Sequence, residues 1–195
     1  MNYPLTIRFR ILAVARQLSV TGANGEVLMY VKQKAFKLRE AITVFADQEQ
    51  TRPLYRIAAD RIIDFSATYS ITTEDGAAVG ALRQKGVRSM WRSHYELVRD
   101  GDVVFTATEE NPFAKFANQL FEGIPIVGAF SGYVFHPRYR ISTADGEPVV
   151  RAEKKAAFLE SVFTVDRLAT PLSPEDERLL LIGCVAMILL ERRRG

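Results

Sequence analysis

The feature that constrains the fold most is an uncharged stretch near the C-terminus, residues 179–190, in which every residue is apolar or glycine. Ser173 precedes it as a good helix N-cap, and Pro174 suits the first helical position. The flanking charges complement the helix dipole, with Glu175, Asp176 and Glu177 at the start and Arg192, Arg193 and Arg194 at the end. This predicts a helix over residues 174–193. Because it has no polar face, either protein or lipid must surround it.

The length of this stretch favours protein. At 1.5 Å per residue its uncharged core spans roughly 18 Å, whereas a bilayer core needs about 20 apolar residues. A membrane protein anchored by this helix is therefore kept only as a third hypothesis. Cys184 is the single cysteine of the chain, so no intrachain disulfide can form, and a packed side chain is expected.

Hairpin turns repeat through the rest of the chain. Asn24-Gly25, Asp75-Gly76, Asp100-Gly101 and Asp145-Gly146 are all dipeptides typical of tight hairpins, because their residues tolerate positive φ angles. A weaker polar turn at 47–50 falls near the missing midpoint, which gives a unit of about 25 residues. Residues 5–11 alternate apolar and polar side chains, as a half-buried strand does.

The residues at even offsets from the turn glycines are expected to face inward. They are Val27, Met29 and Val31; Ala78, Gly80 and Leu82; and Pro148, Val150 and Ala152. Several are small, which leaves room along the axis of a sheet that closes on itself. The expected fold is therefore mainly β with helices: a closed antiparallel β-barrel, one domain over residues 1–195, with the C-terminal helix running through it.

A second helix is predicted over residues 112–122, where Asn111-Pro112 provides the cap and first turn and Gly123 ends it. Its apolar residues share one face, and the candidate interfacial residues are Phe113, Phe116 and Phe121. The alternative is that this face plugs the barrel.

The repeated hairpins, the capped apolar helix and the stretch Tyr69-Ser70-Ile71-Thr72-Thr73-Glu74-Asp75-Gly76 together resemble the Tubby C-terminal-like superfamily. Within it, the chain is most similar to the LURP-one-related proteins, with phospholipid scramblases as distant kin. The resemblance implies a barrel of about twelve strands around a central helix. It also implies binding of phosphoinositide headgroups, as in Tubby domains. Residues 172–177 lack the acidic calcium-loop pattern of scramblases, so calcium-dependent scrambling is not expected.

Enzyme motifs such as a P-loop, G-x-G-x-x-G or G-x-S-x-G do not occur in the sequence. His94 and His136 are the two histidines, and with one cysteine they do not make a metal-ligand cluster. We therefore expect a non-enzymatic protein with no catalytic residues, no metal and no cofactor.

Lysines follow three of the turn glycines at the same distance of nine residues: Lys34, Lys85 and Lys155. In an up-and-down barrel they should lie at one rim, and the candidate lipid- or phosphate-binding residues are Lys32, Lys34, Arg83, Lys85, Lys154 and Lys155. Basic residues beside an anionic leaflet favour membrane binding. The alternative is that they are strand-end charges that block edge pairing.

The leading hypothesis from the sequence is a module that binds an anionic phospholipid, a phosphoinositide headgroup or a similar phosphorylated ligand. A protein-interaction scaffold is the second hypothesis, so the expected partner is an anionic lipid headgroup or another protein. The net charge of +3 is too mild for a dedicated nucleic-acid binder. The first residues do not have a signal-peptide pattern, so we expect a cytoplasmic protein, peripheral to the inner membrane face when it binds lipid.

Overall fold

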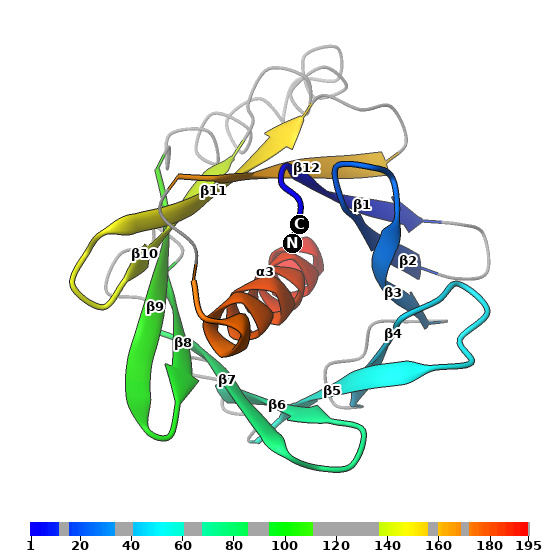
Figure 1. Ribbon diagram of the computed structural model, residues 1–195, viewed down its shortest axis with the longest axis horizontal. Coiled ribbons are helices and arrows are strands. Elements are labelled where there is room, and N and C mark those ends of the chain that lie inside the picture. Colours follow the sequence, from blue (N-terminus) through cyan, green and yellow to red (C-terminus); the bar gives the residue numbers. More distant parts are fainter. Residues whose placement is uncertain are drawn as a thin grey trace.

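The computed structural model describes residues 1–11, 16–33, 41–60, 68–85, 94–110, 137–155, 160–168 and 172–194. These residues form a closed barrel around one helix (Figure 1). The strands are β1 (Leu5–Ile11), β2 (Arg16–Thr21), β3 (Val27–Gln33), β4 (Ile42–Phe45), β5 (Pro53–Ala59), β6 (Thr68–Thr73), β7 (Ala78–Gln84), β8 (His94–Arg99), β9 (Asp102–Glu109), β10 (Arg138–Thr143), β11 (Pro148–Lys155) and β12 (Glu160–Arg167). The helix is α3 (Pro174–Arg194).

Each strand pairs with its neighbours in sequence, and all the pairings are antiparallel. β1 closes the barrel against β12, with Leu5 opposite Val165 and Arg10 opposite Glu160. The alternation predicted for β1 is confirmed, because Leu5, Ile7 and Phe9 are buried. Closure pairs the first strand with the last and so removes the exposed sheet edge.

Residues 179–190 of α3 are buried on every side (Figure 1). The predicted central helix is therefore confirmed, and it ends one residue later than expected. Protein side chains from the strands surround it and form the core together with it. Among the described residues, no helix is long and apolar enough to cross a bilayer.

Contacts at the start of α3 attach it to the barrel wall. The backbone N–H of Asp176 donates to Ser173 Oγ at 3.1 Å, which confirms the predicted N-cap. Arg99 Nη1, at the end of β8, lies 2.8 Å from Asp176 Oδ1. Arg167 Nη1, at the end of β12, lies 3.1 Å from Glu177 Oε1. The acidic first turn is therefore paired with arginines of two separate strands.

Two glycines let α3 approach β7 and β8. A Cβ placed on Gly80 of β7 would meet Leu179 of α3, and a Cβ placed on Gly183 of α3 would meet Leu97 of β8. At each glycine, a leucine of the facing element thus occupies the space that a side chain would fill. The small inward residue predicted at position 80 has the expected effect of leaving room for the helix.

The prediction of inward positions is wrong at Ala78 and Pro148, which are both exposed. The pairing register shifts next to each of these turns, between Ile71 and Thr72 and again between Ile141 and Ser142. A β-bulge of this kind adds one residue to a strand and reverses the alternation beyond it. Val79 and Val149 are buried instead.

Several predicted features lie outside the described residues. They are the helix over residues 112–122 with Phe113, Phe116 and Phe121, the candidate Lys34, and His136.

Candidate functional site

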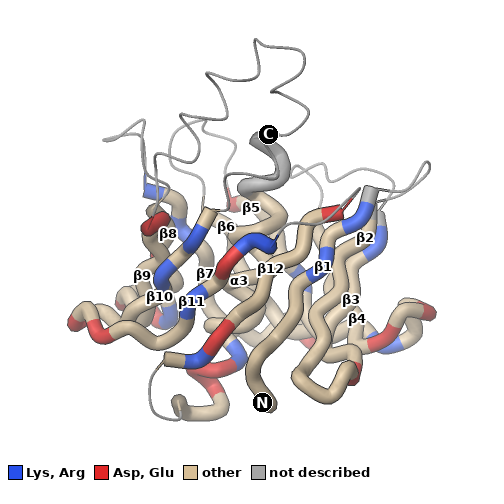
Figure 2. Tube along the Cα trace, turned by 90° about the horizontal axis from the view of Figure 1, so that it is seen from above, with Lys and Arg blue, Asp and Glu red and all other residues tan. Residues whose placement is uncertain are grey.

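The two ends of the barrel differ in how the strands are connected. Five tight hairpin turns of the described chain, near Gly25, Asp47, Gly76, Gly101 and Gly146, lie at the end where α3 begins. We call this the hairpin end: these turns, the two strand residues beside each turn, the last two residues of β12, and residues 174–178. The C-terminal end is the opposite one, where α3 ends (Figure 2).

The hairpin end is strongly acidic. Among side chains that the structure describes there, thirteen are acidic and four are basic, a formal charge of −9. The acidic residues are Glu26, Asp47, Glu49, Glu74, Asp75, Asp100, Asp102, Asp145, Glu147, Asp166, Glu175, Asp176 and Glu177, and the basic ones are Arg52, Arg99, Arg167 and Arg178.

The remaining described side chains, from mid-barrel to the C-terminal end, have the opposite balance. Eleven are basic and six are acidic, a formal charge of +5. The basic residues are Arg8, Arg10, Lys32, Arg56, Arg83, Lys85, Arg138, Arg140, Arg151, Lys154 and Lys155; the acidic ones are Asp60, Glu96, Glu109, Glu110, Glu153 and Glu160. Figure 2 shows this polarity, with blue segments on β1, β10 and β11 above the red turns.

The topology brings the predicted rim residues to one end, as expected from the repeat. Five of these residues lie near the ends of β3, β7 and β11, which run in the same direction: Lys32, Arg83, Lys85, Lys154 and Lys155. Lys32, Lys85 and Lys155 are all exposed, and Lys85 and Lys155 are in ion pairs. Of the lysines that follow the turn glycines, Lys85 and Lys155 are therefore partly neutralised by carboxylates.

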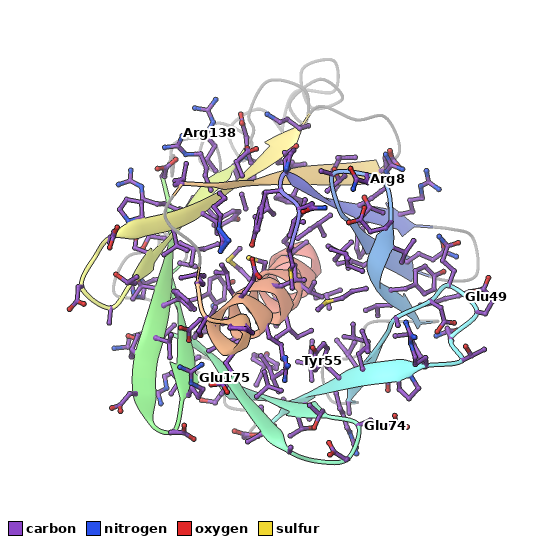
Figure 3. All side chains as sticks on the ribbon, viewed as in Figure 1. Arg8, Glu49, Tyr55, Glu74, Arg138 and Glu175 are labelled. Carbon is purple, nitrogen blue, oxygen red and sulfur yellow. The ribbon has the colours of Figure 1, made fainter. Side chains whose placement is uncertain are left out.

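Sequence reasoning missed most of a second group of basic residues, on the outer wall from β10 round to β1, and named only Lys155 of this group. We call Arg8, Arg10, Arg138, Arg140, Arg151 and Lys155 the basic face. Figure 3 places Arg8 and Arg138 on the outside of the barrel wall. The signal was present in Arg8-Phe9-Arg10 and Arg138-Tyr139-Arg140, where a buried aromatic residue separates two outward arginines. The alternation that predicts a strand also predicts that such arginines share its outer side.

Four carboxylates between mid-barrel and the C-terminal end are each flanked by two cations. The pairs are Glu96 with Arg83 (3.5 Å) and Lys85 (2.7 Å), Glu110 with Arg140 (2.6 Å) and Arg151 (3.2 Å), Glu153 with Arg138 (3.0 Å) and Lys155 (2.8 Å), and Glu160 with Arg8 (3.4 Å) and Arg10 (2.7 Å). Each cluster keeps one surplus positive charge. Exposed ion pairs contribute only about 0–1 kcal/mol, so such partners can be exchanged for an external anion.

These contacts shift carboxyl pKa values. Partial burial opposes ionisation of Glu110, but hydrogen bonds and charge from Arg140 and Arg151 outweigh it and lower the pKa. A hydrogen bond from Lys155 and another from Arg138 lower the pKa of Glu153 despite some desolvation. Both carboxylates are therefore ionised at neutral pH.

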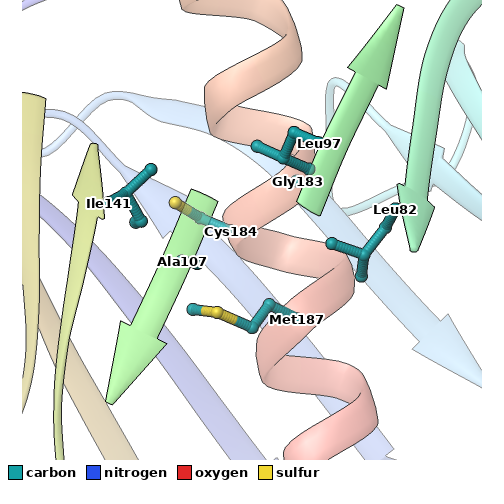
Figure 4. Close-up of a pocket in the computed structure, with 7 residues that line it drawn as sticks. All are labelled: Leu82, Leu97, Ala107, Ile141, Gly183, Cys184 and Met187. Carbon is teal, nitrogen blue, oxygen red and sulfur yellow. The ribbon is translucent and has the colours of Figure 1, made fainter. Parts of the chain in front are cut away.

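A small cavity lies beside the helix, among the described residues. This cavity, of about 10 Å³, is lined by Leu82, Leu97, Ala107, Ile141, Gly183, Cys184 and Met187 (Figure 4). That volume is roughly the minimum for one water molecule, and its lining is apolar. A ligand much larger than a water molecule therefore does not fit in this cavity.

The described part of the chain contains one histidine and one cysteine. His94 begins β8, and its Nδ1 lies 3.4 Å from Thr108 Oγ1. Cys184 is buried in the core. In the described ranges, no three His, Cys, Asp or Glu side chains cluster as metal ligands would.

Comparison with protein families gives one match, to the family model described as LURP-one-related, over residues 27–188. The chain belongs to the LURP-one-related family. The matched range runs from the start of β3 into α3, so it includes most of the barrel wall and most of the central helix. Searches of curated proteins and of solved structures found no significant match. Of the basic face, Arg8 and Arg10 precede the range that matches the LURP-one-related model, and the other four residues lie within it.

Proposed function

We propose that this LURP-one-related barrel is a non-enzymatic module that binds an anionic phospholipid headgroup, or a similar phosphorylated ligand, through its C-terminal end and basic face. The observation that carries the proposal is the charge asymmetry of the barrel, −9 at the hairpin end against +5 over the rest of the described side chains. A surface whose net charge has one sign raises the local concentration of ligands of the opposite charge.

The asymmetry favours one orientation on a membrane. A basic residue near an anionic leaflet contributes about 1 kcal/mol, and the attraction decays within a Debye length of the surface. The acidic hairpin end is repelled by the same surface. The barrel therefore binds with its C-terminal end toward the lipid and its turns in water, as a peripheral protein of the cytoplasmic face.

Vesicle co-sedimentation tests this function. The protein is mixed with neutral phosphatidylcholine vesicles and with vesicles that also contain phosphatidylserine, at low and at high salt. We expect retention on the anionic vesicles only, and a loss of retention as salt rises, because exposed charges are screened. Charge reversal at Lys34, Lys85 and Lys155, or at Arg8 and Arg10, should reduce the retained fraction.

The matched control is Arg52→Glu with Arg178→Glu. It changes the net charge as much as Arg8→Glu with Arg10→Glu does, but at exposed residues of the hairpin end. Equal retention on neutral and anionic vesicles would contradict the proposal. So would equal losses for the control and the basic-face variant, since binding would then follow net charge and not position.

A protein-interaction scaffold is the alternative function. Protein interfaces usually contain a cluster of large apolar side chains at their centre. In the described part of the surface, the exposed large hydrophobic residues are Met1 and Leu168, which gives this alternative less support. Native mass spectrometry of the purified protein with its co-purifying material tests it: a stoichiometric protein partner, without any vesicle binding, would favour the scaffold.

A further inference from the structure

The basic face contains one place where two arginines converge on a single carboxylate. Arg140 of β10 and Arg151 of β11 are directly opposite each other in the ladder. Like charges in such a pair destabilise a sheet unless an anion lies between them. Glu110 supplies it: its Oε1 accepts from Arg140 Nε at 2.6 Å, and its Oε2 lies 3.2 Å from Arg151 Nε.

Glu110 is held there by the backbone. It follows β9 directly, and its N–H donates to the carbonyl oxygen of Arg138 at 2.7 Å. Arg151 donates to Glu110 Oε1 through its Nη2 at 3.5 Å, but its Nε, although buried and close to the carboxylate, has no hydrogen-bond partner in the described part of the chain, so the arginine is satisfied incompletely. Both guanidinium-bearing side chains remain about half exposed, at 50% for Arg140 and 43% for Arg151. A larger anion from solution can reach them.

More positive charge lies beside this pair toward the C-terminal end. Arg138 lies two residues from Arg140 on the same side of β10, and with Lys155 it flanks Glu153. On the β12 side, Asp166 lies directly across from Arg151 in the β11–β12 ladder. An anion in the place of Glu110 would thus contact the two arginines, and Arg138, Lys155 and Glu153 are the neighbouring charges along β10 and β11.

We propose that Arg140 and Arg151 form a binding site for a phosphomonoester, and that the Glu110 carboxylate occupies this site when no ligand is bound. This proposal rests on the proposed function and specifies the chemical class of its ligand. A phosphomonoester has a charge between about −1.5 and −2 at neutral pH and three acceptor oxygens, so it outcompetes a carboxylate of charge −1. Guanidinium groups bind such oxyanions through parallel hydrogen bonds, which a lysine ammonium cannot reproduce.

Two kinds of vesicle at matched surface charge test the site. One contains phosphatidic acid, whose headgroup is a phosphomonoester, and the other contains phosphatidylserine, whose phosphate is a diester. Since a charge-assisted hydrogen bond contributes about 1.5–3 kcal/mol, we expect the wild-type protein to prefer phosphatidic acid by about tenfold or more. Arg140→Gln with Arg151→Gln should abolish this preference.

Three further variants separate the site from general charge. Arg8→Gln with Arg10→Gln removes the same charge from the cluster around Glu160 and should keep the preference. Arg140→Lys with Arg151→Lys keeps the charge and the fold but should lose the preference. Glu110→Gln should bind phosphatidic acid more tightly than the wild type, whereas a purely structural role of Glu110 predicts weaker binding. Circular dichroism confirms that each variant is folded.

Soluble glycerol 3-phosphate identifies the source of the phosphate. If it competes with phosphatidic acid vesicles for the wild type, a free phosphomonoester is sufficient; if only vesicles compete, the site binds the group on a lipid surface. Equal binding of both vesicle types by the wild type would overturn this inference while leaving the proposed function in place. No binding of either type above neutral vesicles would overturn both. A preference that survives the lysine variant, or weaker binding by Glu110→Gln, would also overturn the inference.

Discussion

Gly80 of β7 lies directly against Leu179 of α3: a Cβ on Gly80 would be 2.7 Å from Leu179 Cδ1 and 2.5 Å from the carbonyl oxygen of Val98. The φ angle of Gly80 is also +152°, which side chains rarely adopt. The central helix and the wall therefore meet at a position where only a hydrogen atom fits, and the packing of the helix depends on this glycine.

Replacing this glycine should destabilise the barrel strongly. Gly80→Ala combines backbone strain with overpacking, each of which costs about 1–3 kcal/mol, so we expect a loss of roughly 3 kcal/mol in the free energy of unfolding by urea. Gly76→Ala is the matched control. Gly76 also has a positive φ, +88°, but a Cβ added there would have no atom within 4 Å. This variant should cost about 1 kcal/mol. Equal losses would show that strain alone, without the contact to Leu179, sets the requirement at Gly80.

The reciprocal contact, between Gly183 of α3 and Leu97 of β8, predicts energetic coupling. A Cβ on Gly183 would overlap the terminal carbons of Leu97, so Gly183→Ala should cost about 1–3 kcal/mol. Leu97→Ala alone leaves a cavity and should cost about 2–5 kcal/mol. Because the smaller side chain makes room for the new methyl group, the double variant should be less destabilised than the sum of the two. Additive losses in urea titrations would contradict direct packing of these residues.

Protonation of the carboxylates that pair with the basic face should lower the stability of the fold in acid. The pKa values of Glu110 and Glu153 are lowered in the folded protein from 4.5, so their ionised forms stabilise the fold above that pH. This contribution is lost as the pH falls through the lowered pKa values. Glu110→Gln with Glu153→Gln should be less stable at pH 7, by up to about 1 kcal/mol per exposed cluster, and should show a shallower loss of melting temperature between pH 5 and pH 3.

The control for the loss of stability in acid is Glu74→Gln. It removes an exposed turn carboxylate that has no ion pair in the described part of the chain. It should melt in acid as the wild type does. Asp47 and Asp75 also have lowered pKa values, from hydrogen bonds to Thr51 and Thr73, so some acid destabilisation persists in every variant. An unchanged slope in the double variant would show that the arginine clusters do not stabilise the folded state.

The thiol of Cys184 should report whether the helix leaves the barrel. It is buried, and this burial raises its pKa to about 12, so almost none is the reactive thiolate at pH 8. We expect no reaction with an aromatic disulfide reagent in native buffer and reaction of one thiol per chain in urea. Rapid native labelling, or labelling induced by anionic vesicles, would show that α3 exits from the barrel.

Much of the fold could be predicted because the relevant signals are local. Tight turns need residues that tolerate positive φ, which located the hairpins around Gly25, Gly76, Gly101 and Gly146, and all four glycines have positive φ angles. A polar turn also occurs near Asp47, as expected, where the carboxylate accepts from the backbone N–H groups of Thr51 and Arg52. The strand number came from the family resemblance, since periodicity alone does not count strands.

The candidate site was predicted only in part. The repeat placed Lys85 and Lys155 at one end of the barrel correctly, because the direction of a strand follows from the turns before it. It did not reveal the carboxylates that pair with them, such as Glu96 with Lys85, because cross-strand partners depend on register. Bulges after the turns change that register, which is also why Ala78 and Pro148 are exposed.

The sequence by itself determined that a capped, wholly apolar helix had to be enclosed and that repeated hairpins could enclose it, because turn chemistry, capping and hydrophobic pattern act over a few residues. Only the tertiary structure decided where charge accumulates. Arg140, Arg151 and Glu110 come from three different strands or their ends, and barrel closure brings β12 against β1. Charge–charge interactions depend on distance in space, so the acidic end, the basic face and the arginine pair exist only once the strands are in register.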